Sequence, residues 1–252
     1  MKIAAVCCTF LRPRPLGQMI RCFELQDCPA EKRELVVLDD AGQYRAKDEA
    51  RMTNDEARLA AHGPGWRLYS QSQRFATLGE KRNAAARLVS DDAEALAVWD
   101  DDDLYLPWAL SASVAALHSA PWSRPSLVLH PRPDGSLAKH RTGGLFHGGW
   151  AYRRSAFERV GGYPAMNNGE DQALARRFSE IDAGHADPCA LGFEPFYVYT
   201  WHGGWHLSGM GPDGYRRLGR RPARKATLRV ADPPHVDLRN PKILPEVHPR
   251  LF

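Results

Sequence analysis

Residues 97–107 read AVWDDDDLYLP, in which four consecutive carboxylates follow one apolar run and precede another. Four like charges side by side repel one another, and without compensation the repulsion raises their pKa values and costs stability. A chain with such a run where a strand is expected to end either binds a group that compensates the charge or leaves the run as a solvated acidic loop. If strand geometry continues, Asp100 and Asp102 point one way, and Asp101 and Asp103 the other. The run then divides into a ligand-facing pair and a pair that binds backbone amides or caps a helix.

Strand-length apolar runs and helix-forming segments alternate through the first hundred residues. Strands are predicted at 2–9, 34–40, 66–71 and 95–99, and helices at 16–26 and 78–90. Pro13 and Pro15 are expected to interrupt regular structure after the first strand. Continuous apolar strands favour a Rossmann-like α/β fold, in which a mainly parallel sheet is covered by helices on both faces.

Polar residues gather at the predicted strand ends. In open α/β sheets, ligands bind outside the carboxyl ends of the strands. Thr9, Asp39 with Asp40, and the aspartate run all follow apolar strands and would meet at that edge. The carboxyl edge of the sheet is therefore the predicted site.

The pattern changes after residue 107. Helices are predicted at 107–119 and 170–181, and short strands at 126–133 and 136–142, joined by a turn at Asp134-Gly135. Residues 211–252 contain seven prolines and little periodicity, and we expect an extended or partly ordered tail there.

Composition places the chain among ordinary globular proteins, with 43% hydrophobic and 25% charged residues in 252. No stretch approaches the roughly 18 apolar residues of a membrane span. The N-terminus predicts a first strand and not a signal peptide. The five cysteines include no C-x-x-C pair, which favours reduced thiols over a disulfide frame or a zinc site. These features predict a cytoplasmic protein.

Several stretches in order resemble family two glycosyltransferases, which have the A-type glycosyltransferase fold. WDDDDLYLPWAL is similar to their D-x-D segment. CTFLRP and VVLDD resemble the ends of their first two strands, LGEKRNAAA their G-x-x-x-x-R-N segment, and FERVGGYPAMNNGEDQALARRF the segment that carries the catalytic acid. The likeness covers residues 1–210, read as one domain with a nucleotide-sugar-binding half (1–105) and an acceptor and catalytic half (106–210). The tail, 211–252, has no counterpart.

The resemblance implies a nucleotide-sugar donor, with a UDP-sugar favoured, a divalent cation (Mn²⁺ or Mg²⁺) and inversion at the anomeric carbon. It implies Asp102 as a metal ligand, and we treat His206 as a second candidate ligand. It implies Asp171 as the general base, with Glu170 next. The two acids could also simply compensate the charge of a helix N-terminus. The implied donor-binding residues are Thr9, Asp39, Arg82, Asp100 and Asp101, although Arg82 could equally be an ordinary helix surface residue.

The acceptor is open at this stage, as is the oligomeric state. Residues 213–252 hold ten Lys or Arg against four Asp or Glu, a charge of +6, whereas residues 1–212 carry −2. The basic stretch could contact nucleic-acid phosphates, which would suit a hydroxymethylated DNA base as acceptor, or an anionic membrane. It could also be a solvated tail beside a saccharide-glycosylating enzyme. Its members are Arg216, Arg217, Arg220, Arg221, Arg224 and Lys225.

Two other classes of protein also fit part of the pattern. A non-catalytic nucleotide or carbohydrate-binding module on the same fold need keep neither Asp102 nor Asp171, so their presence favours an enzyme. A nucleotidyltransferase also uses paired acids and a metal ion, but it leaves the Glu170-Asp171 segment unexplained.

Overall fold

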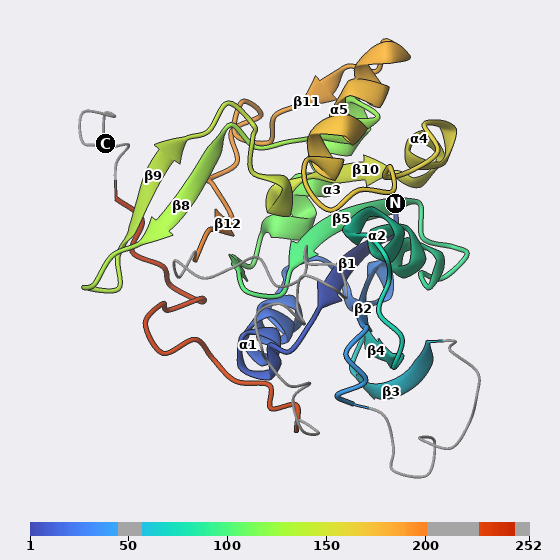
Figure 1. Cartoon of the computed structure of the whole chain (residues 1–252). Helices are drawn as coiled ribbons and strands as arrows, with labels where there is room; N and C mark the ends of the chain where they lie inside the picture. Colours follow the sequence, from blue (N-terminus) through green and yellow to red (C-terminus); the bar gives the residue numbers. More distant parts are fainter. Residues whose placement is uncertain (45–56, 201–226, 245–252) are drawn as a thin grey trace.

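The computed structural model describes residues 1–44, 57–200 and 227–244, and an eight-stranded sheet forms its centre (Figure 1). The strand order is β11-β7-β10-β5-β1-β2-β4-β3, with β1, β2, β4 and β5 parallel to one another. The strands are β1 (Ile3–Thr9), β2 (Arg33–Asp39), β3 (Arg58–Gly63), β4 (Trp66–Ser70), β5 (Ala95–Asp100), β7 (Trp122–Ser123), β10 (Ala151–Arg153) and β11 (His185–Ala186). The predicted α/β class with a mainly parallel central sheet is confirmed.

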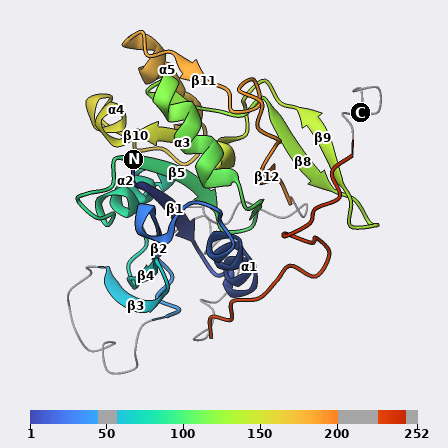
Figure 2. The same ribbon diagram turned by 180° about the vertical axis from the view of Figure 1, so that it is seen from behind.

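Helices cover both faces of this sheet, and Figures 1 and 2 view it from opposite sides. Alternate residues of each strand enter different cores: Ile3 and Ala5 pack with the residues of α1 and α3, whereas Ala4 packs with those of α5. Burial on both faces explains why these strands are apolar throughout. The helices are α1 (Pro13–Glu24), α2 (Leu78–Arg87), α3 (Ala109–Ser119), α4 (Arg154–Arg159) and α5 (Glu170–Glu180).

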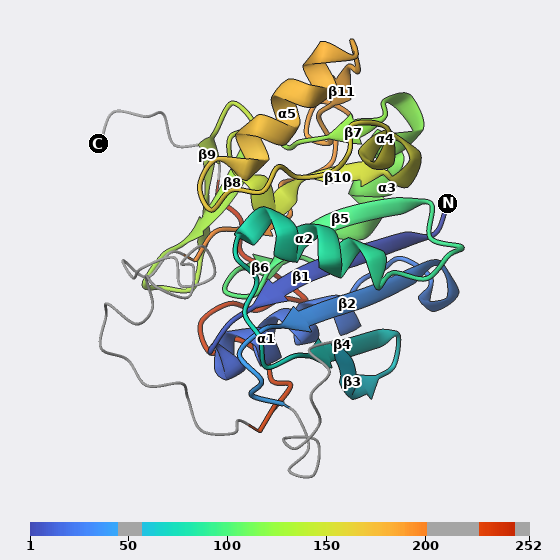
Figure 3. The ribbon, with the colours of Figure 1, turned by 45° about the vertical axis from the view of Figure 1, so that its right-hand side comes forward.

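A second, four-stranded sheet lies beside the first, with the order β6-β12-β8-β9 (Figure 3). The hairpin of β8 and β9 turns at Asp134-Gly135 as predicted, and Gly135 has a φ of 80° there. The described residues also form two 3₁₀ helices, η1 (Ala30–Lys32) and η3 (His147–Gly149). Among the described helices, none combines the length and apolarity needed to cross a membrane. The strands of this sheet are β6 (Leu104–Tyr105), β8 (Leu127–Pro131), β9 (Leu137–Arg141) and β12 (Tyr197–Val198).

One local prediction was wrong, and several strands were not predicted. Helix α1 begins at Pro13 and includes Pro15, although both prolines were expected to interrupt regular structure. Proline is tolerated in a first helical turn, because the backbone N–H groups there have no partner within the helix. Strand β3 was not predicted at all, since its sequence lacks alternation and β-branched residues. It forms by pairing antiparallel to the edge of β4.

The described part of the tail, 227–244, is extended, as predicted, and packs on the domain. Leu137 of β9 exchanges backbone hydrogen bonds with Lys242 and Leu244. Gly17 of α1 lies against this segment so closely that a Cβ there would approach the carbonyl oxygen of Arg229 to 1.9 Å. The segment therefore packs against both α1 and β9 as part of the folded body.

Helix α2 begins with a reciprocal cap that offers a stability test. Thr77 Oγ1 accepts a hydrogen bond from the Glu80 amide at 3.2 Å, and Glu80 Oε2 accepts one from the Thr77 amide at 2.9 Å. We expect Thr77→Ala to lower the free energy of unfolding by about 1 kcal/mol, the usual value of such a cap. Urea denaturation measures this, with Glu80→Gln as the matched control, since glutamine can complete the same box. Equal losses in both variants would contradict the capping role.

Candidate active site

The carboxyl ends of the parallel strands bring polar residues together at one edge, as predicted. Thr9 of β1 lies opposite Asp39 of β2 in the register, and Cys8 lies opposite Asp100 of β5. Asp39 in turn lies opposite Ser70 of β4. The aspartate run therefore leaves the sheet at its carboxyl edge, where the chain turns toward β6.

The loop before α5 docks on α2 and carries the second pair of acids to the same edge. The Leu78 amide donates to Asn167 Oδ1 at 2.9 Å. Asn83 holds Tyr163 through two hydrogen bonds, one to its carbonyl oxygen at 2.8 Å and one from its amide at 2.9 Å. Asn83 thus has a structural role. A Cβ on Gly79 would lie 1.8 Å from the Pro164 carbonyl oxygen, so only glycine permits this contact.

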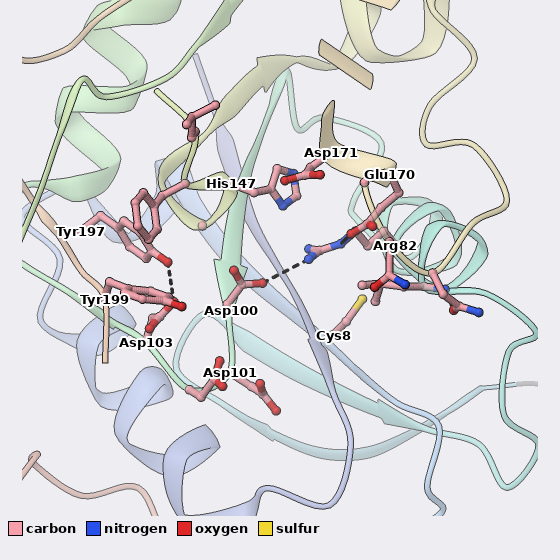
Figure 4. A pocket seen from close by; sticks show the side chains of 18 of the residues that line it. Cys8, Arg82, Asp100, Asp101, Asp103, His147, Glu170, Asp171, Tyr197 and Tyr199 are labelled. Carbon is pink, nitrogen blue, oxygen red and sulfur yellow. Dashed lines mark hydrogen bonds and ion pairs between the residues drawn. The ribbon is translucent and has the colours of Figure 1, made fainter. Parts of the chain in front are cut away.

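These segments enclose a cavity of about 340 Å³, within the size range of small-molecule sites (Figure 4). Its walls come from the ends of β1 and β5, the start of α2, the loop before α5, η3 and β12. Its charged side chains are Arg12, Arg82, Asp100, Asp101, Asp102, Asp103, Glu170 and Asp171. Residues far apart in the sequence therefore place six carboxylates and two guanidinium groups around one space.

Burial alternates along the aspartate run as the strand geometry predicted: Asp101 and Asp103 are 2% and 4% exposed, whereas Asp100 and Asp102 are more accessible. Asp101 Oδ2 accepts a hydrogen bond from the Thr9 hydroxyl at 2.7 Å. Asp103 Oδ1 accepts the Thr200 amide at 2.8 Å, and its Oδ2 accepts the Tyr197 hydroxyl. The buried pair thus fixes the loop, and all four side chains still contribute to the cavity wall.

Arg12 partly compensates the negative charge of the aspartate run. This residue was not predicted from the sequence. Its Nη1 lies 2.9 Å from Asp101 Oδ1 and 2.6 Å from Asp102 Oδ2. Burial and the neighbouring Asp101 nevertheless raise the pKa of Asp102 to about 7, although Arg12 opposes the shift. Arg12 alone therefore leaves the charge of Asp102 incompletely compensated.

Arg82 links the two acidic segments. Its Nη2 lies 3.3 Å from Asp100 Oδ1, and its Nε lies 3.3 Å from Glu170 Oε1 in an ion pair that lacks hydrogen-bond geometry. Burial raises the pKa of Glu170, and Arg82 opposes the shift. Asp171 Oδ1 accepts the Gln172 amide at 2.7 Å. Within the described ranges no hydrogen-bond partner contacts Asp171 Oδ2, so this oxygen is free to act.

Lys81 is a second residue that was not predicted from the sequence. It stabilises the carboxyl edge of the sheet from the side of α2. Its side chain is only 1% exposed, although a lysine in a helix is normally expected at the surface. The Nζ donates to the Thr9 carbonyl oxygen at 2.6 Å and to Asp40 Oδ1 at 2.5 Å. The ion pair therefore joins α2 to the ends of β1 and β2.

The structure places most of the predicted residues at the cavity, with three exceptions. Asp39 does not line it: its carboxylate is buried and accepts hydrogen bonds from the Ala41 amide and the Ser70 hydroxyl. Thr9 does not line the cavity either; its hydroxyl donates a hydrogen bond to Asp101, which does. His206 lies outside the described residues, as does the basic stretch Arg216, Arg217, Arg220, Arg221, Arg224 and Lys225.

The donor set of this cavity fits a hard divalent cation. Within residues 1–44, 57–200 and 227–244, no three His, Cys, Asp or Glu side chains are arranged to hold an ion alone. Mg²⁺ and Mn²⁺ at phosphate sites need only one or two carboxylates, because phosphate and water supply the other ligands. Asp102, accessible and incompletely compensated, together with Asp100 meets that requirement.

No protein-family model matches the sequence, and no curated protein is significantly similar to it. Among solved structures, the chain resembles S. aureus TarS 1–349 in complex with UDP-GlcNAc, with a TM-score of 0.55 and 16% identity, over 86% of this chain and 64% of that one. It also resembles the mannosyltransferase PcManGT from Pyrobaculum calidifontis in complex with GDP-Man and Mn²⁺, with a TM-score of 0.54 and 18% identity, over 82% and 58% of the two chains.

These neighbours have the A-type glycosyltransferase fold, and the likeness shows that this chain has it too. The predicted fold is therefore confirmed. The chain spans less than two thirds of the length of either neighbour.

Proposed function

We propose that the protein transfers a sugar from a nucleotide-sugar donor to an acceptor hydroxyl, with inversion and with a divalent cation in the site. The observation that carries the proposal is the meeting of two acidic segments, Asp100–Asp103 and Glu170–Asp171, around one cavity at the carboxyl edge of an A-type fold. A binding module would need to hold a ligand but would not need an accessible acid opposite a cation site. The neighbours bound to UDP-GlcNAc and GDP-Man support this donor class.

The cation site belongs at Asp102 and Asp100 in this proposal. When bound, the cation would neutralise the negative charge that builds on the leaving diphosphate. Arg12 fixes the carboxylate of Asp102, and Arg82 fixes that of Asp100, so neither has to be ordered when a ligand enters. Such preorganised charges are the main source of electrostatic catalysis.

Asp171 is the proposed base. Its Oδ1 is anchored by the Gln172 amide, and Oδ2 is available to take the proton of an acceptor hydroxyl as that hydroxyl attacks. Glu170 is engaged with Arg82 and is 5% exposed, which fits a positioning role better. A single displacement assisted by one base inverts the anomeric carbon.

The test is a screen of nucleotide sugars for hydrolysis with Mn²⁺, with Mg²⁺ and with chelator. We expect release of nucleoside diphosphate from at least one donor, a UDP-sugar first, and loss of that activity in chelator. A catalytically incompetent binding module would hold a nucleotide sugar and leave it intact under all conditions.

The acceptor is a second question for the same assay. Saccharides and DNA containing hydroxymethylated bases are the two acceptor classes to add to the active donor. Transfer to one class, read by mass of the product, identifies it. Hydrolysis without transfer to either would contradict both acceptor proposals and leave the donor assignment in place.

A further inference from the structure

His147 stands out in the cavity wall because part of its hydrogen-bonding capacity is unused. It begins the 3₁₀ helix η3, is 8% exposed and lines the cavity. Figure 4 shows its ring in the cavity that Asp171 also lines, with one ring nitrogen pointing toward the side where Asp100 and Arg82 meet. The ring packs edge-on against Trp150, with centroids 5.2 Å apart.

The backbone beneath His147 leaves the ring little freedom. A Cβ on Gly148 would approach the Tyr197 ring to 2.7 Å, and one on Gly149 would approach Pro125 to 2.8 Å. The His147 carbonyl oxygen also accepts the Trp150 amide at 2.9 Å. The backbone that carries the imidazole is thus fixed before any ligand binds.

Only one of the two ring nitrogens has a partner in the described part of the chain. His147 Nε2 lies 2.9 Å from the Tyr163 hydroxyl and 3.0 Å from the Tyr152 hydroxyl, and the two hydroxyl oxygens are 3.3 Å apart. Nδ1 has no hydrogen-bond partner there. Burial, and then the charge of Arg82, lower the pKa of His147 well below its usual value, so the ring is neutral and carries one proton.

The tyrosines decide which nitrogen carries that proton. Each hydroxyl has a proton to donate. If Nδ1 is protonated, Nε2 accepts from Tyr163, and Tyr152 donates to the Tyr163 oxygen, so both hydroxyl protons are used. If Nε2 is protonated, one hydroxyl proton has no acceptor in this cluster, and Nδ1 is left as an unused acceptor as well. The first arrangement leaves a single unpaired group, a buried Nδ1–H on a side chain that lines the cavity.

We propose that this Nδ1–H donates a hydrogen bond to an oxygen of the transferred sugar, and that His147 therefore helps to select the sugar. The inference rests on the proposed function. A neutral N–H suits a hydroxyl or amide carbonyl oxygen, whereas a phosphate is bound more strongly by a charged donor. His147 and Asp171 line the same cavity, in which the sugar must present its anomeric carbon to the acceptor.

Two substitutions at His147 separate its two nitrogens. His147→Gln places an amide near the position of Nε2, which can still accept from the tyrosines, but has no donor at the position of Nδ1. His147→Asn places its amide near Nδ1 and loses the link to the tyrosines. Tyr152→Phe is the control for the buried cluster, because Tyr152 does not line the cavity.

Calorimetric titration in Mn²⁺ with two matched pairs, UDP against UDP-GlcNAc and GDP against GDP-mannose, gives the readout. For the pair that the wild type binds, we expect His147→Gln to weaken nucleotide-sugar binding about tenfold and leave nucleoside diphosphate binding unchanged, the size of one lost hydrogen bond at a buried donor. His147→Asn should restore most of the loss, and Tyr152→Phe should keep the sugar preference while lowering the melting temperature.

The inference is overturned if His147→Gln binds the nucleotide sugar as tightly as the wild type, or if it weakens both members of a pair equally. A purely structural histidine would instead make His147→Asn the worse variant. Failure of the wild type to bind any nucleotide sugar, including UDP-glucose and UDP-galactose, would overturn the proposed function itself and this inference with it.

Discussion

Asp102→Asn is expected to lower metal-dependent donor hydrolysis by about 10³-fold or more, since a bound cation supplies several kcal/mol of charge stabilisation. The substitution keeps the volume and one oxygen of the side chain but removes the charge that the cation needs. Arg12 would keep its contact with Asp101 at 2.9 Å, so the loop should stay in place. Mn²⁺ titration of the variant should show the weakened affinity directly, and initial hydrolysis rates should fall with it.

Asp92→Asn is a matched control, because Asp92 is an exposed acid that pairs with Lys2, away from the cavity. It should bind Mn²⁺ and hydrolyse donor like the wild type. The melting temperature of each variant separates loss of the ion from loss of the fold. Unchanged Mn²⁺ affinity in a folded Asp102→Asn protein, or full activity in excess chelator, would remove Asp102 from the cation site.

The architecture was predictable where burial dictates the sequence. Strand β1 must be apolar on both faces because helices cover both, so IAAVCCT indicates a central strand without further context. The same holds for β2 and β5. Because these strands are parallel, polar residues directly after them lie at the same carboxyl edge of the sheet. The aspartate run and Thr9 could therefore be placed together from the sequence.

The partners of those residues were not predictable, because tertiary contacts supply them. Nothing in TFLRP says that Arg12 turns back to Asp101 and Asp102, and LGEKRN gives no sign that Lys81 is buried while Glu80 caps the helix. A lysine is expected at the surface unless a buried acid is known to pair with it. Asp40 is buried beside Lys81 only in the folded chain, so the sequence does not show this pair. Two-residue strands such as β7 and β11 were missed because only pairing with neighbouring strands defines them.

His147 shows the limit most clearly. In GGLFHGGWAY it is one histidine among glycines and aromatic residues, and a lone histidine is more often structural. Its role depends on two tyrosines that follow in the sequence and lie behind the ring, within 3.0 Å of Nε2. Only the positions of these tyrosines show which ring nitrogen of His147 is left without a hydrogen-bond partner.

Asp171→Asn should lower sugar transfer by about 10² to 10⁴-fold, the usual contribution of a general base, and leave donor binding close to that of the wild type. Asparagine keeps an oxygen for the Gln172 amide, so the start of α5 should not change, but it cannot take the proton of an attacking hydroxyl. Steady-state transfer rates, together with calorimetric donor affinity, separate the two effects.

Glu170→Gln is the matching variant, because the two acids are adjacent and only their surroundings differ. Glu170 is 5% exposed and paired with Arg82, so its loss should loosen Arg82 and Asp100 and weaken donor binding along with the rate. The pair therefore predicts opposite signatures: a rate defect with intact binding for Asp171, and a binding defect for Glu170. If the folded Asp171→Asn protein transfers sugar at the normal rate while Glu170→Gln loses the rate alone, the base is Glu170, and the ion pair with Arg82 must open during the reaction.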